Sequence, residues 1–209
     1  LDVGTAAGHV GRNGDHAGTA GFHNDLSFSF MLFSIQHVVR NACFSQHVAD
    51  KFGVFDRSRT DENRLAAAVG ANTIYPNSDI LIVDFGTAIT FDFVSAEGEF
   101  LGGNISPGAA TRFRALHHFT RKLPLCELID REVFMGRDTV SAIEGGIVNG
   151  IVYEVEGYIR DLERKYDGLR IIFTGGDSNF FAKRVKKPIF ATYDLVAYGL
   201  NRILEYNAK

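Results

Sequence analysis

The spacing of apolar and polar residues predicts three consecutive strands in the middle of the chain, followed by alternating helices and strands. Residues 80–84 read ILIVD, which is apolar on both faces, as in a central strand. Residues 88–94 and 99–105 follow after short turns and predict two more strands. Residues 138–166 carry the longest helical pattern, whose apolar face consists of Ile143, Ile147, Ile151, Val155 and Ile159.

Shorter segments complete the series. The alanine-rich residues 63–75 predict a helix before the strands. Ser106 and Pro107 offer an N-cap and a first-turn proline for a helix through about His118. A strand that runs into a glycine turn, a helix, a strand and a final helix are predicted over residues 170–177, 178–185, 188–191 and 194–206. This order predicts the α/β class, with a mixed sheet covered by helices.

The amino-acid composition changes near residue 60. The first 61 residues contain no Glu, Pro or Tyr, whereas five of the seven histidines lie within the first 47 residues. We therefore expect two parts, a divergent or truncated N-terminal lobe at residues 1–60 and a C-terminal lobe at residues 61–209. A disturbed reading frame upstream of residue 60 is the alternative explanation.

The overall composition excludes several classes of protein. The 209 residues are 45% hydrophobic and carry a net charge of −3, which favours a packed core and argues against a nucleic-acid-binding protein. Two cysteines cannot build a disulfide framework and fit a reducing, cytoplasmic setting. The longest apolar run, residues 28–35, is far shorter than the roughly 20 residues of a membrane-spanning helix, so we expect no membrane partner.

The strand at residues 80–84 ends in an acid and a tight turn, Asp84-Phe85-Gly86-Thr87. Gly86 lets main-chain N–H groups approach an anion, and Thr87 adds a hydroxyl donor. Asp84 supplies a hard oxygen ligand for a cation that accompanies phosphate groups. A plain hairpin with an exposed acid is the alternative, which explains the glycine but not an acid at the end of so apolar a strand.

Two further glycine turns could also bind a ligand. Gly102-Gly103-Asn104 and the following Ser106-Pro107-Gly108 lead from a strand to a helix N-terminus, where N–H groups attract negative charge. Thr174-Gly175-Gly176-Asp177 would let a flat ligand such as a purine lie against the backbone. Taken singly, each of these segments is equally consistent with a structural turn.

A family resemblance rests on five motifs, which read DENRLAAAVGA, DFGTAITFD, GGNISPG, GRDTVSAIEGG and FTGGD in this order. Together they cover roughly residues 61–207 and resemble the type III pantothenate kinase family of the acetate kinase, sugar kinase, Hsp70 and actin superfamily. The resemblance implies ribonuclease H-like, actin-like ATPase lobes, with residues 61–209 as the C-terminal lobe. It implies transfer of the γ-phosphate of ATP to pantothenate, giving 4′-phosphopantothenate in the first step of coenzyme A biosynthesis.

The resemblance also implies cofactors, a partner and site residues. The cofactors are Mg²⁺ and a monovalent cation, K⁺ or NH₄⁺, and the partner is a second copy in a homodimer. The contacts it implies are Asp84 for the cation, Asp2, Gly4, Thr5, Gly86 and Thr87 for ATP phosphate, Thr174, Gly175 and Gly176 for adenosine, and Arg64 and Thr139 for pantothenate.

One departure from the family concerns the catalytic base. The family's Gly-x-Asp-Arg segment reads Asp61-Glu62-Asn63-Arg64 here, so Asn63 occupies the position of the base. An amide cannot accept a proton at neutral pH, and general-base help is worth about 10²–10⁴-fold in rate. We therefore expect an impaired kinase, unless Asp61 or Glu62 replaces the base, or else a non-catalytic, nucleotide-binding regulatory homologue.

Overall fold

The computed structural model of the protein describes residues 62–192 and 194–208. Their elements follow the predicted order of helices and strands. The elements are α3 (Glu62–Ile74), β1 (Ile80–Phe85), β2 (Ala88–Val94), β3 (Phe100–Pro107), α4 (Ala109–Phe119), α5 (Thr139–Glu163), β4 (Arg170–Thr174), α6 (Ser178–Ala182), β5 (Phe190–Ala191) and α7 (Leu195–Asn207). The expected boundary near residue 60 falls at the edge of the described residues and stays a prediction.

The strands form one mixed sheet in the order β3-β2-β1-β4-β5. β1 pairs antiparallel with β2, and β2 antiparallel with β3, whereas β1 pairs parallel with β4, and β4 with β5. β1 is therefore the central strand, as its two apolar faces predicted. In this register Asp84 lies opposite Thr90 of β2 and Thr174 of β4.

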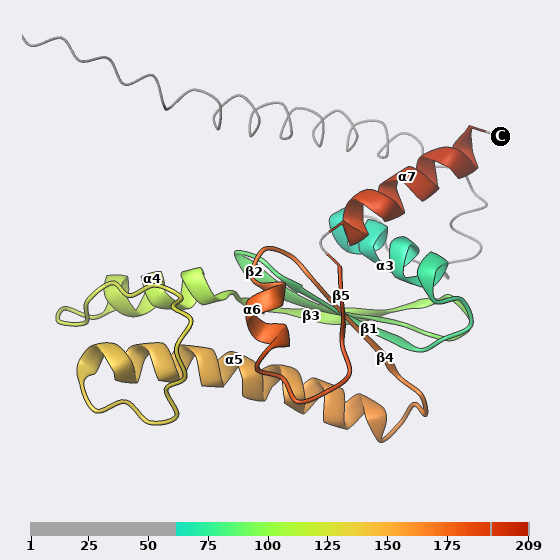
Figure 1. Ribbon diagram of the computed structural model, residues 1–209. Helices are drawn as coiled ribbons and strands as arrows, with labels where there is room; N and C mark the ends of the chain where they lie inside the picture. The colour runs from blue at the N-terminus through green and yellow to red at the C-terminus, as the bar shows by residue number, and fades with distance from the viewer. Residues whose placement is uncertain (1–61, 193, 209) are drawn as a thin grey trace, which may run out of the picture. The chain divides into compact units, whose positions relative to one another are not determined.

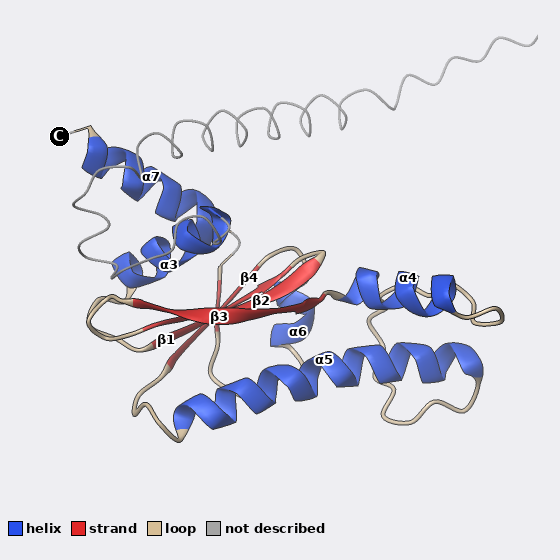
Figure 2. Cartoon of the chain, turned by 180° about the vertical axis from the view of Figure 1, so that it is seen from behind, coloured by secondary structure: helices blue, strands red, loops and turns tan. Residues whose placement is uncertain are grey.

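Helices cover both faces of the sheet (Figures 1 and 2). One face of β1, which includes Ile80 and Ile82, packs with alanines of α3 and with Leu195 of α7. The other face packs against α5, α4 and α6 and forms the larger core. The apolar stripe predicted for residues 138–166 is buried in this second core, which confirms the mixed, helix-covered α/β sheet.

Helices α3 and α7 approach each other closely because each presents a glycine to the other. A Cβ atom on Gly199 would lie 1.8 Å from the carbonyl oxygen of Ala66, and one on Gly70 would lie 2.6 Å from that of Leu195. No side chain fits at these positions unless the backbone moves. This contact holds α3, whose first turn carries Asn63 and Arg64, against α7.

The boundary between β3 and α4 differs from the prediction. Ser106 and Pro107 do not cap a helix but are the last residues of β3, paired with Ile89 and Ala88 of β2. α4 begins at Ala109 after the N-cap residue Gly108. Strand pairing prevails here because β3 is an edge strand, where a proline without an N–H group is tolerated.

Within the described ranges, no helix has the combination of length and apolarity needed to cross a bilayer.

Candidate functional site

Two of the predicted turns lie side by side where β1 and β4 end. The amide of Asp177 donates to the carbonyl oxygen of Phe85 over 3.2 Å. Gly175 has a φ of +89°, and a Cβ atom there would lie 2.3 Å from Oδ1 of Asp84. Glycine is therefore required, both for the left-handed backbone and for the close approach of this turn to the carboxylate.

The segment Ser106-Pro107-Gly108 reaches the same place from β3. The amide of Gly108 donates to the carbonyl oxygen of Thr87 over 2.9 Å, and the Thr111 hydroxyl donates to that same oxygen over 2.7 Å. A Cβ atom on Gly108 would lie 2.0 Å from the carbonyl oxygen of Gly86. Three segments that are distant in sequence thus meet around Asp84, and two of the contacts exclude any side chain.

The meeting point suits an anion and its counter-ion. Gly86, Thr87 and Gly176 are exposed, so their backbone can be approached from solvent, whereas Asp84 is half-buried. No group of three or more His, Cys, Asp or Glu side chains that could hold a metal occurs in the part of the chain that is described. A single carboxylate fits a cation whose other ligands are phosphate oxygens and water. The neighbouring Asp177 is partly buried, and the resulting loss of hydration raises the pKa of its carboxyl group.

A buried polar network lies on the same face of the sheet as Asp84. Side chains alternate along a strand, so Thr90 and Asp92 of β2 face α3 together with Asp84 of β1. Nε of Arg64 donates to Oδ1 of Asp92 over 2.8 Å, and the Thr90 hydroxyl donates to Oδ2 over 3.0 Å. Asn63, at the family's base position, is the preceding residue of α3 and is half-buried.

Sequence reasoning missed Asp92 and Thr90. The available signal was the alternation of β2, in which the polar Thr90 and Asp92 alternate with the apolar Ile89, Phe91 and Phe93. Asp92 is only 1% exposed, and a buried carboxylate requires a partner. Its partner, Arg64, is 28 residues away along the chain, so the pairing could not be assigned without the fold.

Thr139 is not brought to the three turns. Thr139 is exposed at the start of α5, which lies by the far end of α4 and away from the strand ends (Figures 1 and 2). The start of this helix is fixed by Asp138, which accepts from the Ser141 amide over 2.9 Å. Asp2, Gly4 and Thr5 lie outside the described residues.

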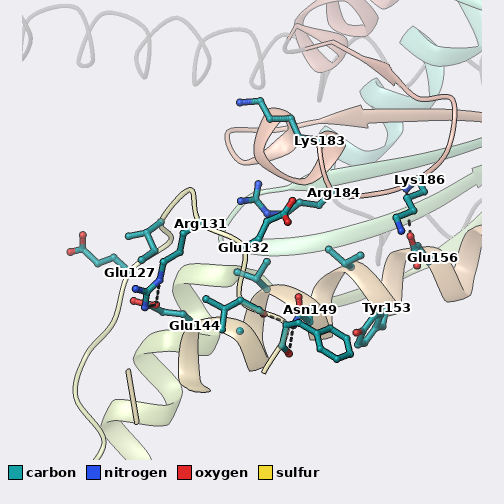
Figure 3. A pocket seen from close by; sticks show the side chains of 16 residues that line it. Glu127, Arg131, Glu132, Glu144, Asn149, Tyr153, Glu156, Lys183, Arg184 and Lys186 are labelled. Atoms are coloured by element: carbon teal, nitrogen blue, oxygen red, sulfur yellow. Dashed lines mark hydrogen bonds and ion pairs between the residues drawn. The ribbon is translucent and has the colours of Figure 1, made fainter. Parts of the chain in front are cut away.

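A cavity of about 410 Å³ lies apart from the turns, between α5, the loop before it and the residues that follow α6 (Figure 3). Acidic and basic side chains both line it, including an ion pair between Arg131 and the buried Glu144. Neither Asp84 nor any of the three glycine turns contributes to its walls. The cavity is therefore not part of the site around Asp84.

Comparison with known proteins identifies a matching family model and similar sequences. The family model for type III pantothenate kinase matches residues 56–161. The type III pantothenate kinase of Porphyromonas gingivalis is 47% identical over 156 residues, which cover 73% of this chain and 64% of the relative. That of Bacteroides fragilis is 48% identical over 145 residues, covering 69% of this chain and 60% of the relative. The matches therefore span less than two thirds of these relatives' length.

Two solved structures share the fold. A Baf family transcriptional activator from Campylobacter jejuni superimposes with a TM-score of 0.53 at 27% identity, covering 74% of this chain and 68% of that chain. A 2-dehydro-3-deoxygalactonokinase from Sinorhizobium meliloti has a TM-score of 0.51 at 12% identity, covering 68% and 58%. Because the identity to the Sinorhizobium meliloti structure is only 12%, that similarity concerns the fold alone.

Proposed function

The chain belongs to the type III pantothenate kinase family, and on this premise we propose that it transfers the γ-phosphate of ATP to pantothenate. The product would be 4′-phosphopantothenate, the first intermediate of coenzyme A biosynthesis. The observation that carries the proposal is that the Gly175 turn packs on Asp84 while Gly108, at the end of β3, packs on the turn that follows Asp84. The exposed Thr87 offers a hydroxyl donor to a phosphate chain at this place, and Asp84 offers a hard oxygen ligand to its cation.

Each turn has a role in this proposal. Gly86 and Thr87 contact phosphate oxygens, and the turn from Thr174 to Gly176 lies against the adenosine. Asp84 holds a cation; when bound, Mg²⁺ and K⁺ or NH₄⁺ neutralise phosphate charge. Phosphoryl transfer depends mainly on positioning and on charge stabilisation, so this half of the site accounts for most of the catalysis expected.

The substrate half of the site comes from α3 and from the start of α5. Arg64 binds the pantothenate carboxylate, because a guanidinium offers paired donors to such a group. Thr139 contacts pantothenate as well, and its distance from the turns suggests that it acts in the site of a second copy. The active form would then be a homodimer, which size-exclusion chromatography with light scattering can test.

A second candidate function is a regulatory homologue that binds a nucleotide without turning it over. Asn63 favours it, since the position of the base holds an amide. The name of the Campylobacter jejuni relative, a transcriptional activator, supports it as well. Under this reading the three turns still bind ATP, but pantothenate does not accelerate ADP release.

ADP release from the purified chain with ATP, Mg²⁺ and K⁺ distinguishes the two functions. A kinase releases ADP only when pantothenate is added, and Asp84→Asn abolishes that release. Binding of a non-hydrolysable ATP analogue without pantothenate-dependent turnover supports the regulatory homologue. Absence of both activities contradicts both proposals for this chain.

A further inference from the structure

The contacts of Arg64 suggest that Asp92 controls how this arginine meets its ligand. Both Nε and Nη2 of Arg64 donate to Oδ1 of Asp92, and the remaining oxygen of Asp92 accepts from Thr90. The Asp92 side chain is 1% exposed and that of Arg64 is 13% exposed. The pair is therefore largely removed from water, and its geometry is set by the protein.

The backbone of β3 encloses the pair from the side. A Cβ atom on Gly103 would lie 2.5 Å from Oδ1 of Asp92 and 2.8 Å from Nη2 of Arg64. The ring of Phe100, also on β3, lies 5.8 Å from Cζ of Arg64. The guanidinium is thus confined by a carboxylate, a strand backbone and an aromatic ring, and it has little freedom to rotate.

These contacts leave one side of the guanidinium for a ligand. A guanidinium has five N–H groups in a rigid plane, and Asp92 occupies the edge formed by Nε and Nη2. Among the described residues, the hydrogen bonds of Arg64 involve only that edge. The end formed by Nη1 and the second hydrogen of Nη2 matches the two oxygens of a carboxylate.

We propose that Asp92 is a positioning residue that holds Arg64 with its Nη1–Nη2 end toward the carboxylate of the acceptor substrate. This inference rests on the proposed function for the identity of that substrate. Stability alone explains the pair poorly, because apolar side chains in place of a buried ion pair are often as stabilising or more so. The network also borders the phosphate half, since Thr90 is the cross-strand partner of Asp84.

The test compares ligand binding by the full chain and by Asp92→Asn, using calorimetry with pantothenate in the presence of a non-hydrolysable ATP analogue. Because Arg64 loses its charged hydrogen-bond partner, Asp92→Asn should bind pantothenate about tenfold or more weakly than the wild type. Affinity for the ATP analogue stays within about twofold, because the three turns are untouched. Glu144→Gln is the matched control, since it breaks another Arg–carboxylate pair with a buried acid and should leave both affinities unchanged.

A second measurement tests the orientation of Arg64 without any substrate. The Nε–H of Arg64 should exchange slowly with solvent in an NMR experiment, and at least about tenfold faster in Asp92→Asn. If Asp92→Asn does not fold, Thr90→Val removes only the neutral donor and should give a smaller change in the same direction.

The outcomes separate this inference from the proposed function. Equal pantothenate binding by the wild type and Asp92→Asn overturns the positioning role and leaves the function in place. If the wild type does not bind pantothenate but the Nε–H of Arg64 is protected in a way that depends on Asp92, the positioning role of Asp92 is supported. The proposal that pantothenate is the substrate is then contradicted. If the Nε–H of Arg64 exchanges as slowly in Asp92→Asn as in the wild type, the positioning role of Asp92 is contradicted whatever the binding result.

Discussion

The proposed phosphate half and the proposed substrate half of the site are assembled in different ways. The phosphate half consists of three turns in direct backbone contact, two of which exclude any residue but glycine. The substrate half consists of single side chains on separate elements: Asn63 and Arg64 on α3, and Thr139 at the start of α5. The phosphate half is held by backbone-to-backbone contacts, whereas the substrate half depends on individual side chains such as Arg64 and its partner Asp92.

The difference indicates which half can change without loss of the fold. Replacing a glycine that touches Asp84 disturbs the ends of two paired strands, whereas Asn63 in place of an acid alters one side chain on a helix. A departure from the family at the substrate half is therefore compatible with an intact phosphate half. Substitutions in the two halves should have separable effects on the binding of nucleotide and of pantothenate.

The largest expected effect is a gain from Asn63→Asp. Restoring a carboxylate at the family's base position should raise pantothenate-dependent ADP release by about 10²–10⁴-fold. Affinity for an ATP analogue should not change, because the phosphate half is unaltered. Steady-state kinetics with both substrates measures the gain.

The matched control for this gain is Asn72→Asp, which adds the same charge later on α3 and should leave turnover unchanged. A gain in both variants would attribute the effect to charge rather than to position. No gain from Asn63→Asp would contradict the assignment of residue 63 to the base.

The next largest effect concerns the phosphate half itself. Gly175→Ala places a Cβ atom 2.3 Å from Oδ1 of Asp84 on a backbone with a φ of +89°. Strain of this kind costs about 1–3 kcal/mol and displaces the carboxylate, so binding of the ATP analogue should weaken about tenfold or more. Calorimetric titration measures this loss.

Gly146→Ala on α5 is the control, because no heavy atom lies within 4 Å of a Cβ atom there and the residue is not part of the proposed site. Its affinity for the ATP analogue should stay within about twofold of the wild type. Equal losses in both variants would contradict the specific role of the contact between Gly175 and Asp84.

Much of the fold could be predicted because its elements depend on local patterns. The two apolar faces of β1 marked it as central, and the isoleucine stripe of α5 gave the face that packs on the sheet. The predicted start of α4 was wrong. Ser106 and Pro107 carry local signals for the start of a helix, but their pairing with β2 overrides these signals. Tertiary pairing is not encoded in the few residues around a boundary.

The candidate site was less predictable, because it depends on contacts between distant segments. Each glycine turn was ambiguous alone, and the contact of Gly108 with Gly86 exists only once β3 has paired with β2. The partnership of Asp92 with Arg64 likewise requires α3 to lie on the correct face of the sheet. The roles implied for Arg64 and Thr139 stay predictions.

A smaller effect is expected from Thr111→Val, which tests how the phosphate half is braced. The Thr111 hydroxyl donates to the carbonyl oxygen of Thr87, so it holds the turn that carries the proposed phosphate contacts. Loss of one neutral hydrogen bond costs about 0.5–1.5 kcal/mol, which predicts about 2–12-fold weaker binding of the ATP analogue.

Thr120→Val serves as its control at the opposite end of α4, where the Thr120 hydroxyl donates to the carbonyl oxygen of Leu116. Nucleotide affinity should be the same in Thr120→Val and in the wild type. A loss in Thr120→Val as large as that in Thr111→Val would show that α4 as a whole, rather than its contact with Thr87, supports the turn.

The smallest effect should come from Asp138→Ala, at the start of the helix that carries Thr139. Hydrogen bonds from the amide and hydroxyl of Ser141 lower the pKa of Asp138. A carboxyl group with a lowered folded-state pKa contributes stability above its unfolded pKa of about 3.9 and loses it as the pH falls through the folded-state value. The Tm of Asp138→Ala should therefore be below that of the wild type at pH 7, and the difference should shrink in acid. Ser141→Ala should show a smaller convergence of the same kind, since it removes only the hydroxyl donor to this carboxylate and keeps the amide. Both variants should bind the ATP analogue normally. Weakened nucleotide binding in either variant would mean that the start of α5 and the three turns are coupled, which would end the separation of the two halves.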